Sequence, residues 1–308
     1  MEIVRRAVID VGTNSVKLLV ADVAGRTVVP VLEESKQTRL GKDFYETHLL
    51  QPEAVARTAG AVAFLAGKAR ALKPLSLRVF ATSAARDAKN PDDLTAAILA
   101  ATGLATEIIS GEHEAEWSFQ GVTTDARLAE VTLLILDVGG GSTEVILGRG
   151  RERQLALSFP LGTVRLLEKF PPGDPPNLVT EYAACRDWVR GLLQAQMRPQ
   201  LASVWPGAVK LVGTGGTATL LGRMERRLDH FDREAIESVR LSRAQVEAWS
   251  ARLWRLPLAE RQGIAGLPRM RADVILMGMV IYEAVMEELG CAELGISTRG
   301  LRFAAVLG

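Results

Sequence analysis

The sequence predicts an α/β protein made of two related halves, and three observations lead to that prediction. The chain has 308 residues, of which 48% are hydrophobic and 24% charged, a composition typical of ordered globular proteins and long enough for two domains. A short motif occurs twice, as DVGTNSVK at residues 10–17 and as DVGGGSTE at residues 137–144. After each copy, a third extended segment comes before helical and extended patterns that alternate. This order, present twice, indicates two similar α/β lobes with the active site in the cleft between them.

The first half opens with apolar runs at residues 7–9, 18–20 and 28–33, which are typical of buried strands. The Gly, Asn and Ser residues between the first two runs indicate a tight turn. The pattern that follows predicts a helix at 52–72, a strand at 77–81, a helix at 84–101, a strand at 106–109 and a helix at 112–120.

The second half repeats this opening, with strands at 133–136, 145–147 and 153–159. Further on, a strand at 209–212 comes before a helix that begins near Ala218, and an apolar run at 274–282 indicates a buried helix too short to cross a bilayer. A linker at 123–130 separates the halves. We therefore expect a first lobe of residues 1–125 and a second lobe of residues 126–297.

The composition excludes several classes of partner. Lys+Arg 37 and Asp+Glu 36 leave a net charge of +1, so no overall field attracts nucleic acid or a membrane surface. The N-terminal residues lack the apolar core of a signal peptide, and the three histidines are not spaced as zinc ligands. Cys185 and Cys291 lie far apart in helical patterns, which predicts free buried thiols in a reducing compartment. We expect a cytoplasmic protein that binds neither nucleic acid nor membranes.

The repeated motif predicts a phosphate-binding turn in each half. A tight turn between two strands presents several backbone N–H groups and a hydroxyl to one point, and the Asp at its root can hold a cation or its water. The alternative is a plain hairpin, since the same residue types form turns without any function. Recurrence in register in both halves favours the functional interpretation. The candidate residues are Asp10, Gly12, Thr13, Asn14 and Ser15 in the first half, and Asp137, Gly140, Gly141, Ser142 and Thr143 in the second.

A third glycine cluster, GTGGT at residues 213–217, follows a predicted strand and comes before a predicted helix. With Ala218 it fits a relaxed dinucleotide fingerprint, which also requires a second strand that ends in an acid about 20 residues later. Residues 223–231 are charged and helical in pattern instead, which excludes a nicotinamide site. The remaining interpretations are a phosphate-facing helix N-terminus that uses Gly213, Gly215 and Gly216, and a plain tight turn.

Two further strand-to-helix junctions carry candidate residues. In ATSAARD, at residues 81–87, Ser83 is placed to cap the helix, and Arg86 lies in the first turn, where the helix dipole disfavours a cation. Arg86 either reaches an anion or is a surface arginine. In SGEHEAE, at residues 110–116, acids in the first turn stabilise the helix, and Glu114 could also take a proton from water.

Taken together with PLGTVRL at residues 160–166, these motifs resemble the exopolyphosphatase and guanosine pentaphosphate phosphohydrolase family. They occur in the same order as in that family, and the resemblance extends from residue 7 to about residue 303. The resemblance implies two ribonuclease-H-like lobes of the actin-like ATPase superfamily. It also implies that a C-terminal helix, at about residues 298–308, packs back on the first lobe. The chain is similar to the short members of the family, so we expect less processivity than in members with additional helical domains.

The resemblance also implies roles for the candidate residues. Glu114 resembles the catalytic glutamate that activates water, with Ser83 and Arg86 at the scissile end. Asp137 and Glu144 resemble the acids that position Mg²⁺, with Mn²⁺ as the alternative, and Asp10 is a further candidate for that role. The three glycine-rich turns correspond to phosphate-holding loops. The implied substrate is inorganic polyphosphate, with guanosine pentaphosphate as a second candidate, and a homodimer is left open.

Two departures from the family pattern concern residues near these motifs. His113 stands where a further Glu is frequent, and Thr298 stands where Asp is frequent, so the roles of both positions are open. Two other functions also remain as alternatives. An ATP-dependent small-molecule kinase of the same superfamily would need an adenosine pocket near residues 213–217, and a non-catalytic nucleotide-binding module would bind a ligand without turnover. The acids around Glu114 argue against the second of these.

Overall fold

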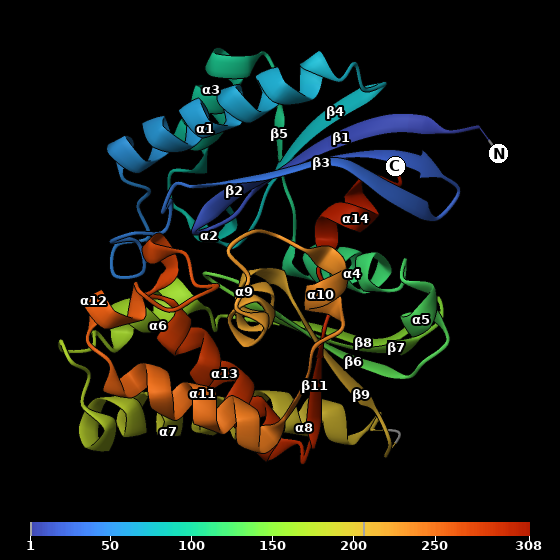
Figure 1. Cartoon of the computed structure of the whole chain (residues 1–308). Coiled ribbons are helices and arrows are strands. Elements are labelled where there is room, and N and C mark those ends of the chain that lie inside the picture. The colour runs from blue at the N-terminus through green and yellow to red at the C-terminus, as the bar shows by residue number, and fades with distance from the viewer. Residues whose placement is uncertain (1, 206) are drawn as a thin grey trace. The chain divides into compact units, whose positions relative to one another are not determined.

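The computed structural model describes residues 2–205 and 207–308, and the chain divides into two compact units. The N-terminal unit consists of Met1–Leu128 and Arg299–Gly308, and the C-terminal unit of Ala129–Thr298. The chain therefore passes between the units twice, after residues 128 and 298. Each unit is built around one β-sheet (Figure 1).

The sheet of the N-terminal unit has the strand order β3-β2-β1-β4-β5. Strands β1 to β3 form an antiparallel meander, and β4 and β5 run parallel to β1. The strands are β1 (Val4–Val11), β2 (Ser15–Ala24), β3 (Thr27–Gln37), β4 (Ser76–Ala81) and β5 (Thr106–Ile108). The helices are α1 (Pro52–Ala71), α2 (Ser83–Asp87), α3 (Pro91–Thr102), α4 (Gly111–Val122), α14 (Leu301–Ala305) and, at the boundary, α5 (Ala126–Ala129).

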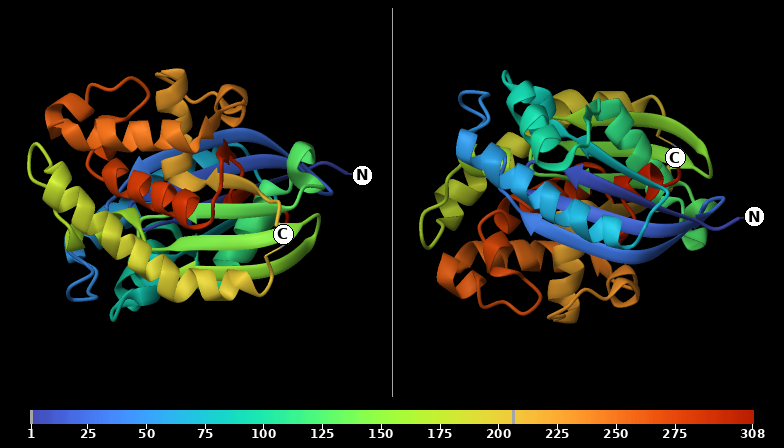
Figure 2. Two further views of the ribbon diagram at one scale, coloured as in Figure 1. Left: turned by 90° about the horizontal axis from the view of Figure 1, so that it is seen from below. Right: turned by 90° about the horizontal axis from the view of Figure 1, so that it is seen from above.

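Successive side chains of β1 point to opposite faces of the sheet, so the core of this unit has one part on each face. Ala7 and Ile9 belong to the hydrophobic cluster under α1, whereas Val8 between them packs in a cluster with Trp117 of α4 and Phe303 of α14. Figure 1 shows α1 and α3 on one face and α4 and α14 on the other, and the right panel of Figure 2 shows α1 lying across the strands. Both faces are covered, which explains why residues 7–9 of β1 and 18–20 of β2 are apolar and buried without alternation.

The sheet of the C-terminal unit has the strand order β10-β11-β9-β6-β7-β8 and repeats the arrangement of the first. Strands β6 to β8 form an antiparallel meander. Strand β9 runs parallel to β6, and β11 runs parallel to β9. Strand β10 is an additional edge strand, antiparallel to β11. The strands are β6 (Leu133–Val138), β7 (Thr143–Arg149), β8 (Glu152–Phe159), β9 (Lys210–Thr214), β10 (Arg240–Ser242) and β11 (Glu293–Ile296). The repeated topology confirms the prediction of two related α/β lobes.

The helices of the C-terminal unit cover this sheet. They are α6 (Thr163–Lys169), α7 (Ala183–Leu192), α8 (Arg198–Ala202), α9 (Gly215–Arg226), α10 (Arg233–Glu237), α11 (Arg243–Arg255), α12 (Leu258–Arg261) and α13 (Ile275–Glu288), with π-helical segments at Leu178–Tyr182 and Leu193–Met197 and a 3₁₀ turn at Arg269–Arg271.

Helix α13 is the central helix of the C-terminal unit. Every residue from Ile275 to Met286 is buried, because α13 packs against α7 and α11 and contributes to the cluster that includes Leu136 and Leu211 of the sheet. The left panel of Figure 2 shows α7 beside α13. A helix that is apolar on all sides belongs in a core of this kind, as the apolar run predicted. Among the residues that the structure describes, no helix combines the length and apolar character needed to span a membrane.

Four sequence-based expectations need correction. The helix predicted at residues 84–101 is two helices, because Pro91 lacks an N–H and disfavours helical geometry at Asn90. The helix predicted over residues 223–231 ends at Arg226, and Arg227 adopts a left-handed conformation with φ 55°. The linker at 123–130 contains the one-turn helix α5. Cys291 lies beyond the end of α13 rather than in a helix, although both cysteines are free and buried as predicted.

Candidate active site

Three strands of the N-terminal unit end at one edge of the sheet. In the parallel register, Val11 of β1 pairs with Ala81 of β4, and Ala81 pairs with Ile108 of β5. The segments that follow these strands are joined by two backbone bonds, from Thr82 N to Val11 O (3.2 Å) and from Ile109 N to Ala81 O (3.0 Å). Ligands of α/β sheets bind at such carboxyl ends. The residues gathered here, called the N-terminal cluster below, are Asp10, Gly12, Thr13, Asn14, Ser15, Ser83, Arg86 and Glu114.

The turn after β1 is held from behind. Gly12 N donates to Ser15 O (3.1 Å), which closes the turn. The chain after β3 then donates to its carbonyls, from Gly41 N to Thr13 O (2.8 Å) and from Arg39 N to Asn14 O (3.0 Å). Because the C=O and N–H of a trans peptide point in opposite directions, the N–H groups of Asn14 and Ser15 point away from this support. Successive N–H groups directed to one side form a concavity that suits an anion.

Two buried side chains of the N-terminal cluster have polar atoms without a protein partner. Asn14 is 5% exposed, and its Oδ1 accepts from Gln37 Nε2 (3.2 Å), but across residues 2–205 and 207–308 its Nδ2 has no acceptor. Within the same residues, the hydroxyl of Ser83, which is 2% exposed, also has none. Buried polar atoms in native proteins almost always have a partner. These two atoms are therefore suited to a ligand that supplies oxygen atoms.

Ser83 does not have the capping role predicted for it. Helix α2 begins at Ser83 itself, the N-cap position is Thr82, and no side chain caps the helix. The prediction placed the cap one residue too late, because a Thr and a Ser are adjacent at this junction. The hydroxyl of Ser83 is thus not occupied by the end of its own helix.

Arg86 and Glu114 form an ion pair. Arg86 Nη1 donates to Glu114 Oε2 (3.0 Å) and to the carbonyl of Ile109 (3.2 Å). Glu114 lies in the first turn of α4, where the hydroxyl of Ser110 caps the helix by accepting from His113 N (3.1 Å). The side chains of Arg86 and Glu114 are 23% and 10% exposed. The guanidinium therefore fixes the direction of a nearly buried carboxylate, as a proton acceptor requires.

The C-terminal unit repeats this arrangement of strand ends. Asp137 of β6 pairs with Thr214 of β9, and Ser297 N donates to Gly213 O (2.9 Å), as Ile109 N does to Ala81 O in the other unit. The residues gathered here, called the C-terminal cluster below, are Asp137, Gly140, Gly141, Ser142, Thr143, Glu144, Gly213, Gly215 and Gly216.

The turn after β6 is also held from behind. Gly139 N donates to Ser142 O (3.0 Å), the counterpart of the bond that closes the first turn. The start of α6 supports the turn through Val164 N to Gly140 O (2.8 Å) and Arg165 Nε to Gly141 O (3.0 Å). The N–H groups of Gly141 and Ser142 point to the opposite side for the reason given above. Both units therefore present the same kind of concavity.

The two units differ in the charge of the residue that pairs, on the next strand, with the Asp at the root of the turn. Asp137 lies directly across from Glu144 in the antiparallel register, and these residues are 6% and 1% exposed. Ser158 Oγ donates to Glu144 Oε1 (2.8 Å). The position opposite Asp10 in the N-terminal unit is Lys17. The C-terminal cluster therefore has two acids opposite each other, whereas the N-terminal cluster has an acid opposite a lysine.

The residues around Asp137 suit a hard divalent cation. A Cβ atom at Gly215, where φ is 82°, would overlap Asp137 Oδ1, so only glycine leaves room for the carboxylate there. Two carboxylates match Mg²⁺, which binds few protein oxygens and keeps waters and substrate phosphates as its other ligands. Asp10, also a candidate ligand, has Lys17 as its opposite residue in the register of β1 and β2.

The glycines of the third turn have different reasons to be glycine. Gly213 lies inside β9, and a Cβ atom there would come 2.7 Å from the hydroxyl of Tyr282. Core packing therefore explains this residue. Gly215 begins α9 and lies against Asp137, whereas a Cβ atom at Gly216 would meet open space.

Sequence reasoning missed the residues that support the two turns. Gly41 and Gly162 each follow the third strand of their unit, and a Cβ atom at either would overlap the turn, at Thr13 and at Gly140 respectively. Arg39 beside Gly41 adopts a left-handed conformation with φ 50°, which is strained for a residue with a side chain. A glycine at the matching place in both halves was the signal that could have revealed this support.

Comparisons with known proteins show which proteins this chain is similar to. A sequence model of the Ppx/GppA phosphatase family matches residues 19–307. Exopolyphosphatase 2 of Mycobacterium tuberculosis is 36% identical over 301 residues, which cover 94% of this chain and 92% of that protein. The crystal structure of the Aquifex aeolicus member of the Ppx/GppA family aligns with a TM-score of 0.80 at 28% identity, over 99% of this chain and 97% of that one. An exopolyphosphatase structure from Cytophaga hutchinsonii aligns with a TM-score of 0.86 at 25% identity, over 97% and 96%.

Proposed function

The chain belongs to the Ppx/GppA phosphatase family, and on that premise we propose that it is an exopolyphosphatase that hydrolyses the terminal phosphoanhydride bond of inorganic polyphosphate and releases orthophosphate. One observation carries the proposal. Two turns of the same hydrogen-bonded form direct rows of N–H groups away from their supports, and a row of this kind matches the oxygens of a phosphoryl group. Each cluster would therefore suit a phosphoryl group.

We propose that Glu114 takes a proton from the water that attacks the terminal phosphorus. Its carboxylate is held by Arg86 and is nearly buried, so its direction is defined before substrate binds. The N–H groups of the turns, Asn14 Nδ2 and the hydroxyl of Ser83 would then bind the phosphoryl oxygens. In phosphoryl transfer, most of the rate enhancement comes from positioning and from stabilising charge rather than from covalent chemistry.

We propose further that Asp137 and Glu144 hold Mg²⁺, with Mn²⁺ as an alternative that suits the same oxygen ligands. When bound, the ion offsets negative charge on the phosphoanhydride oxygens. Ser158 would keep the Glu144 carboxylate oriented through its hydrogen bond of 2.8 Å. Asp10, whose opposite residue is Lys17, would instead anchor its own turn.

Guanosine pentaphosphate is the second candidate substrate, because its 5′ end also carries a terminal phosphoanhydride-linked phosphoryl group. The kinase and the non-catalytic alternatives are not favoured, since the relatives are named as phosphatases over nearly the full length of the chain. We also propose a cytoplasmic location, because both cysteines are free thiols, which suits a reducing compartment. A homodimer stays a prediction.

Phosphate release measured in parallel on long-chain polyphosphate, guanosine pentaphosphate, ATP and pyrophosphate tests the proposal. We expect Mg²⁺-dependent release from polyphosphate without any acceptor molecule. Transfer of the γ-phosphoryl group of ATP to an added acceptor, with formation of ADP, would identify a kinase. Absence of release from both polyphosphate and guanosine pentaphosphate would overturn the proposed function.

A further inference from the structure

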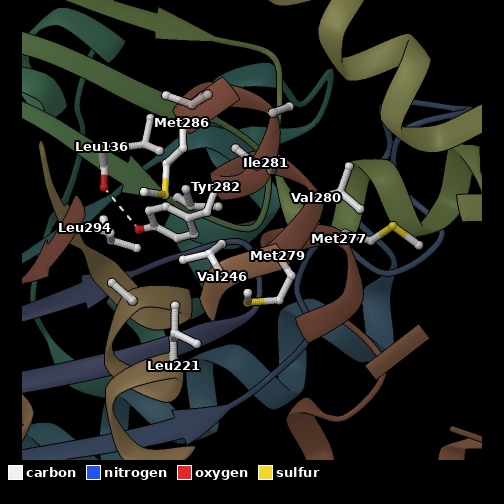
Figure 3. Packing of buried hydrophobic residues seen from close by; sticks show 14 of the residues in the cluster. Leu136, Leu221, Val246, Met277, Met279, Val280, Ile281, Tyr282, Met286 and Leu294 are labelled. Atoms are coloured by element: carbon white, nitrogen blue, oxygen red, sulfur yellow. Dashed lines mark hydrogen bonds between the residues drawn. The ribbon is translucent and has the colours of Figure 1, made fainter. Parts of the chain in front are cut away.

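The central helix α13 contacts the C-terminal cluster through the hydroxyl of Tyr282. Tyr282 is fully buried, and its hydroxyl lies 3.2 Å from the carbonyl oxygen of Leu136 (Figure 3) and 3.4 Å from that of Thr214. Leu136 comes directly before Asp137 at the end of β6, and Thr214 directly before Gly215 at the end of β9. A single phenol therefore bridges the backbone of the two strands that carry the cluster.

The ring of Tyr282 is held in a fitted position. A Cβ atom at Gly213 would come 2.7 Å from its hydroxyl and 2.9 Å from Cε1, so glycine at 213 makes the space for the ring. One helical turn earlier, a Cβ atom at Gly278 would overlap the side chain of Thr217 in the first turn of α9. Helix α13 is thus packed against both β9 and α9, and the phenol has little freedom to move relative to either carbonyl.

The bridged strand ends determine where the Asp137 carboxylate lies. Asp137 Oδ1 occupies the space that a Cβ atom at Gly215 would fill, so a small shift between β6 and β9 would move the carboxylate or block it. Burial, with a contribution from the charge of Asp137, raises the pKa of Tyr282 well above its usual value. The hydroxyl donates to the carbonyl of Leu136 and also lies within reach of that of Thr214.

We propose that Tyr282 is a positioning residue of the phosphatase reaction, whose hydroxyl holds the ends of β6 and β9 in the register that directs Asp137 and the turn at Gly215 toward phosphate and cation. The proposal rests on the proposed function. Nothing in the pattern of the apolar run 274–282 indicated it, because the partners of Tyr282 lie in distant parts of the sequence.

The competing explanation is that Tyr282 only fills the core, and Tyr182 provides the matched control. Its hydroxyl donates to Glu283 Oε1 (2.5 Å), on the residue of α13 next to Tyr282 but in contact with a different neighbour. Tyr182→Phe removes a hydroxyl that hydrogen-bonds to α13, Tyr282→Phe removes a hydroxyl that α13 carries, and each variant keeps the ring. Only Tyr282 touches the C-terminal cluster.

The test compares the two variants with the wild type in three measurements: polyphosphate hydrolysis, Mn²⁺ affinity, and amide hydrogen exchange of the metal-free protein. For Tyr282→Phe we expect kcat to fall about tenfold with KM for polyphosphate within about twofold, and Mn²⁺ to bind about tenfold more weakly, as for other residues that orient a metal ligand. Amide hydrogen exchange in Tyr282→Phe should be faster than in the wild type at residues 137–141 and 214–218. Tyr182→Phe should change none of these, although both variants should lose some thermal stability.

Wild-type kcat, Mn²⁺ affinity and exchange in Tyr282→Phe would overturn the proposal, and so would equal losses in Tyr182→Phe. If the wild type released no phosphate from any substrate, the proposed function would fail separately. Mn²⁺ affinity and amide exchange would still decide whether Tyr282 positions the cluster.

Discussion

Glu114 is the residue on which the proposed chemistry depends most directly. Glutamine has the same shape and can keep a hydrogen bond to Arg86, but it cannot accept a proton. We expect Glu114→Gln to lower the rate of phosphate release by ~100- to 10,000-fold, the usual contribution of a general base, while polyphosphate still binds. Steady-state kinetics and a binding titration measure the two effects. Glu112→Gln, in the same first turn of α4, is the control and should stay near wild type.

Gly162 supports the C-terminal turn at a point where no side chain fits. A Cβ atom there would overlap the backbone of Gly140, and backbone cannot move aside as the end of a side chain can. We expect Gly162→Ala to lower kcat/KM by at least about tenfold, since a displacement of about 1 Å at a catalytic site has effects of this size or larger. Gly191→Ala in α7, where a Cβ atom meets nothing within 4 Å, is the control. Full activity in Gly162→Ala would show that the turn tolerates displacement.

At the scale of single residues, the sequence predicted the residues that form the two turns but not the residues that support those turns. Gly12, Ser15, Gly140 and Ser142 could be predicted because turn formers recur in register. The supports at Gly41, Gly162 and Tyr282 were not predicted, because each acts through a contact with a distant segment of chain. Gly213 shows the same limit, since its place in a glycine-rich motif suggested phosphate whereas packing against a tyrosine explains it.

Helix α14 is short, yet it completes one face of the core of the N-terminal unit. Phe303 is fully buried with Trp117 and Phe80, and α4, which carries Glu114, is its main helical neighbour. We expect Phe303→Ala to lower the free energy of unfolding by about 3–5 kcal/mol, because it removes a large buried side chain and leaves a cavity. Urea unfolding measures the change.

Phe64→Ala is the matched control for this prediction. Phe64 is 47% exposed on α1, where Lys36 and Lys68 lie over its ring. Its removal should cost less than about 1 kcal/mol, because an exposed ring buries little apolar surface and an exposed cation–π contact is weak. Equal losses in the two variants would contradict the structural role given to α14.

At the scale of elements, periodicity predicted strands and long helices well because each has one continuous buried face. The prediction of a single helix over residues 84–101 was wrong because the apolar period continued through Pro91, whose missing N–H the period does not reveal. The cap at Ser83 was misplaced by one residue because side-chain type alone does not decide between adjacent Thr and Ser residues.

For the molecule as a whole, the opposed acids of the C-terminal cluster predict how a cation affects stability. Mg²⁺ that binds only the folded state at about 100 times its Kd should stabilise the wild type by about 2.7 kcal/mol, a rise of several degrees in Tm. Asp137→Asn should raise the Tm of the metal-free protein, because it removes a like charge across from Glu144, and should lose most of the response to Mg²⁺. Scanning calorimetry with and without Mg²⁺ measures both effects.

Glu152→Gln, which removes an exposed acid on β8, should keep the wild-type response to Mg²⁺ and serves as the control. If Mg²⁺ stabilised Asp137→Asn as much as the wild type, the cation would bind elsewhere.

At the scale of the whole molecule, the sequence predicted the two-lobed α/β fold and the family correctly, because the duplication spans nearly the whole chain.

The return of residues 299–308 to the N-terminal unit has a consequence for biosynthesis. As the chain leaves the ribosome, β1 to β5 and α1 to α4 emerge first, but α14 follows only after the entire C-terminal unit has been made. Until then, the apolar patch around Val8, Phe80 and Trp117 faces solvent, in the kind of partly folded state that aggregates or recruits chaperones. Nascent chains stalled before residue 299 should therefore engage chaperones more persistently than chains in which α14 has emerged.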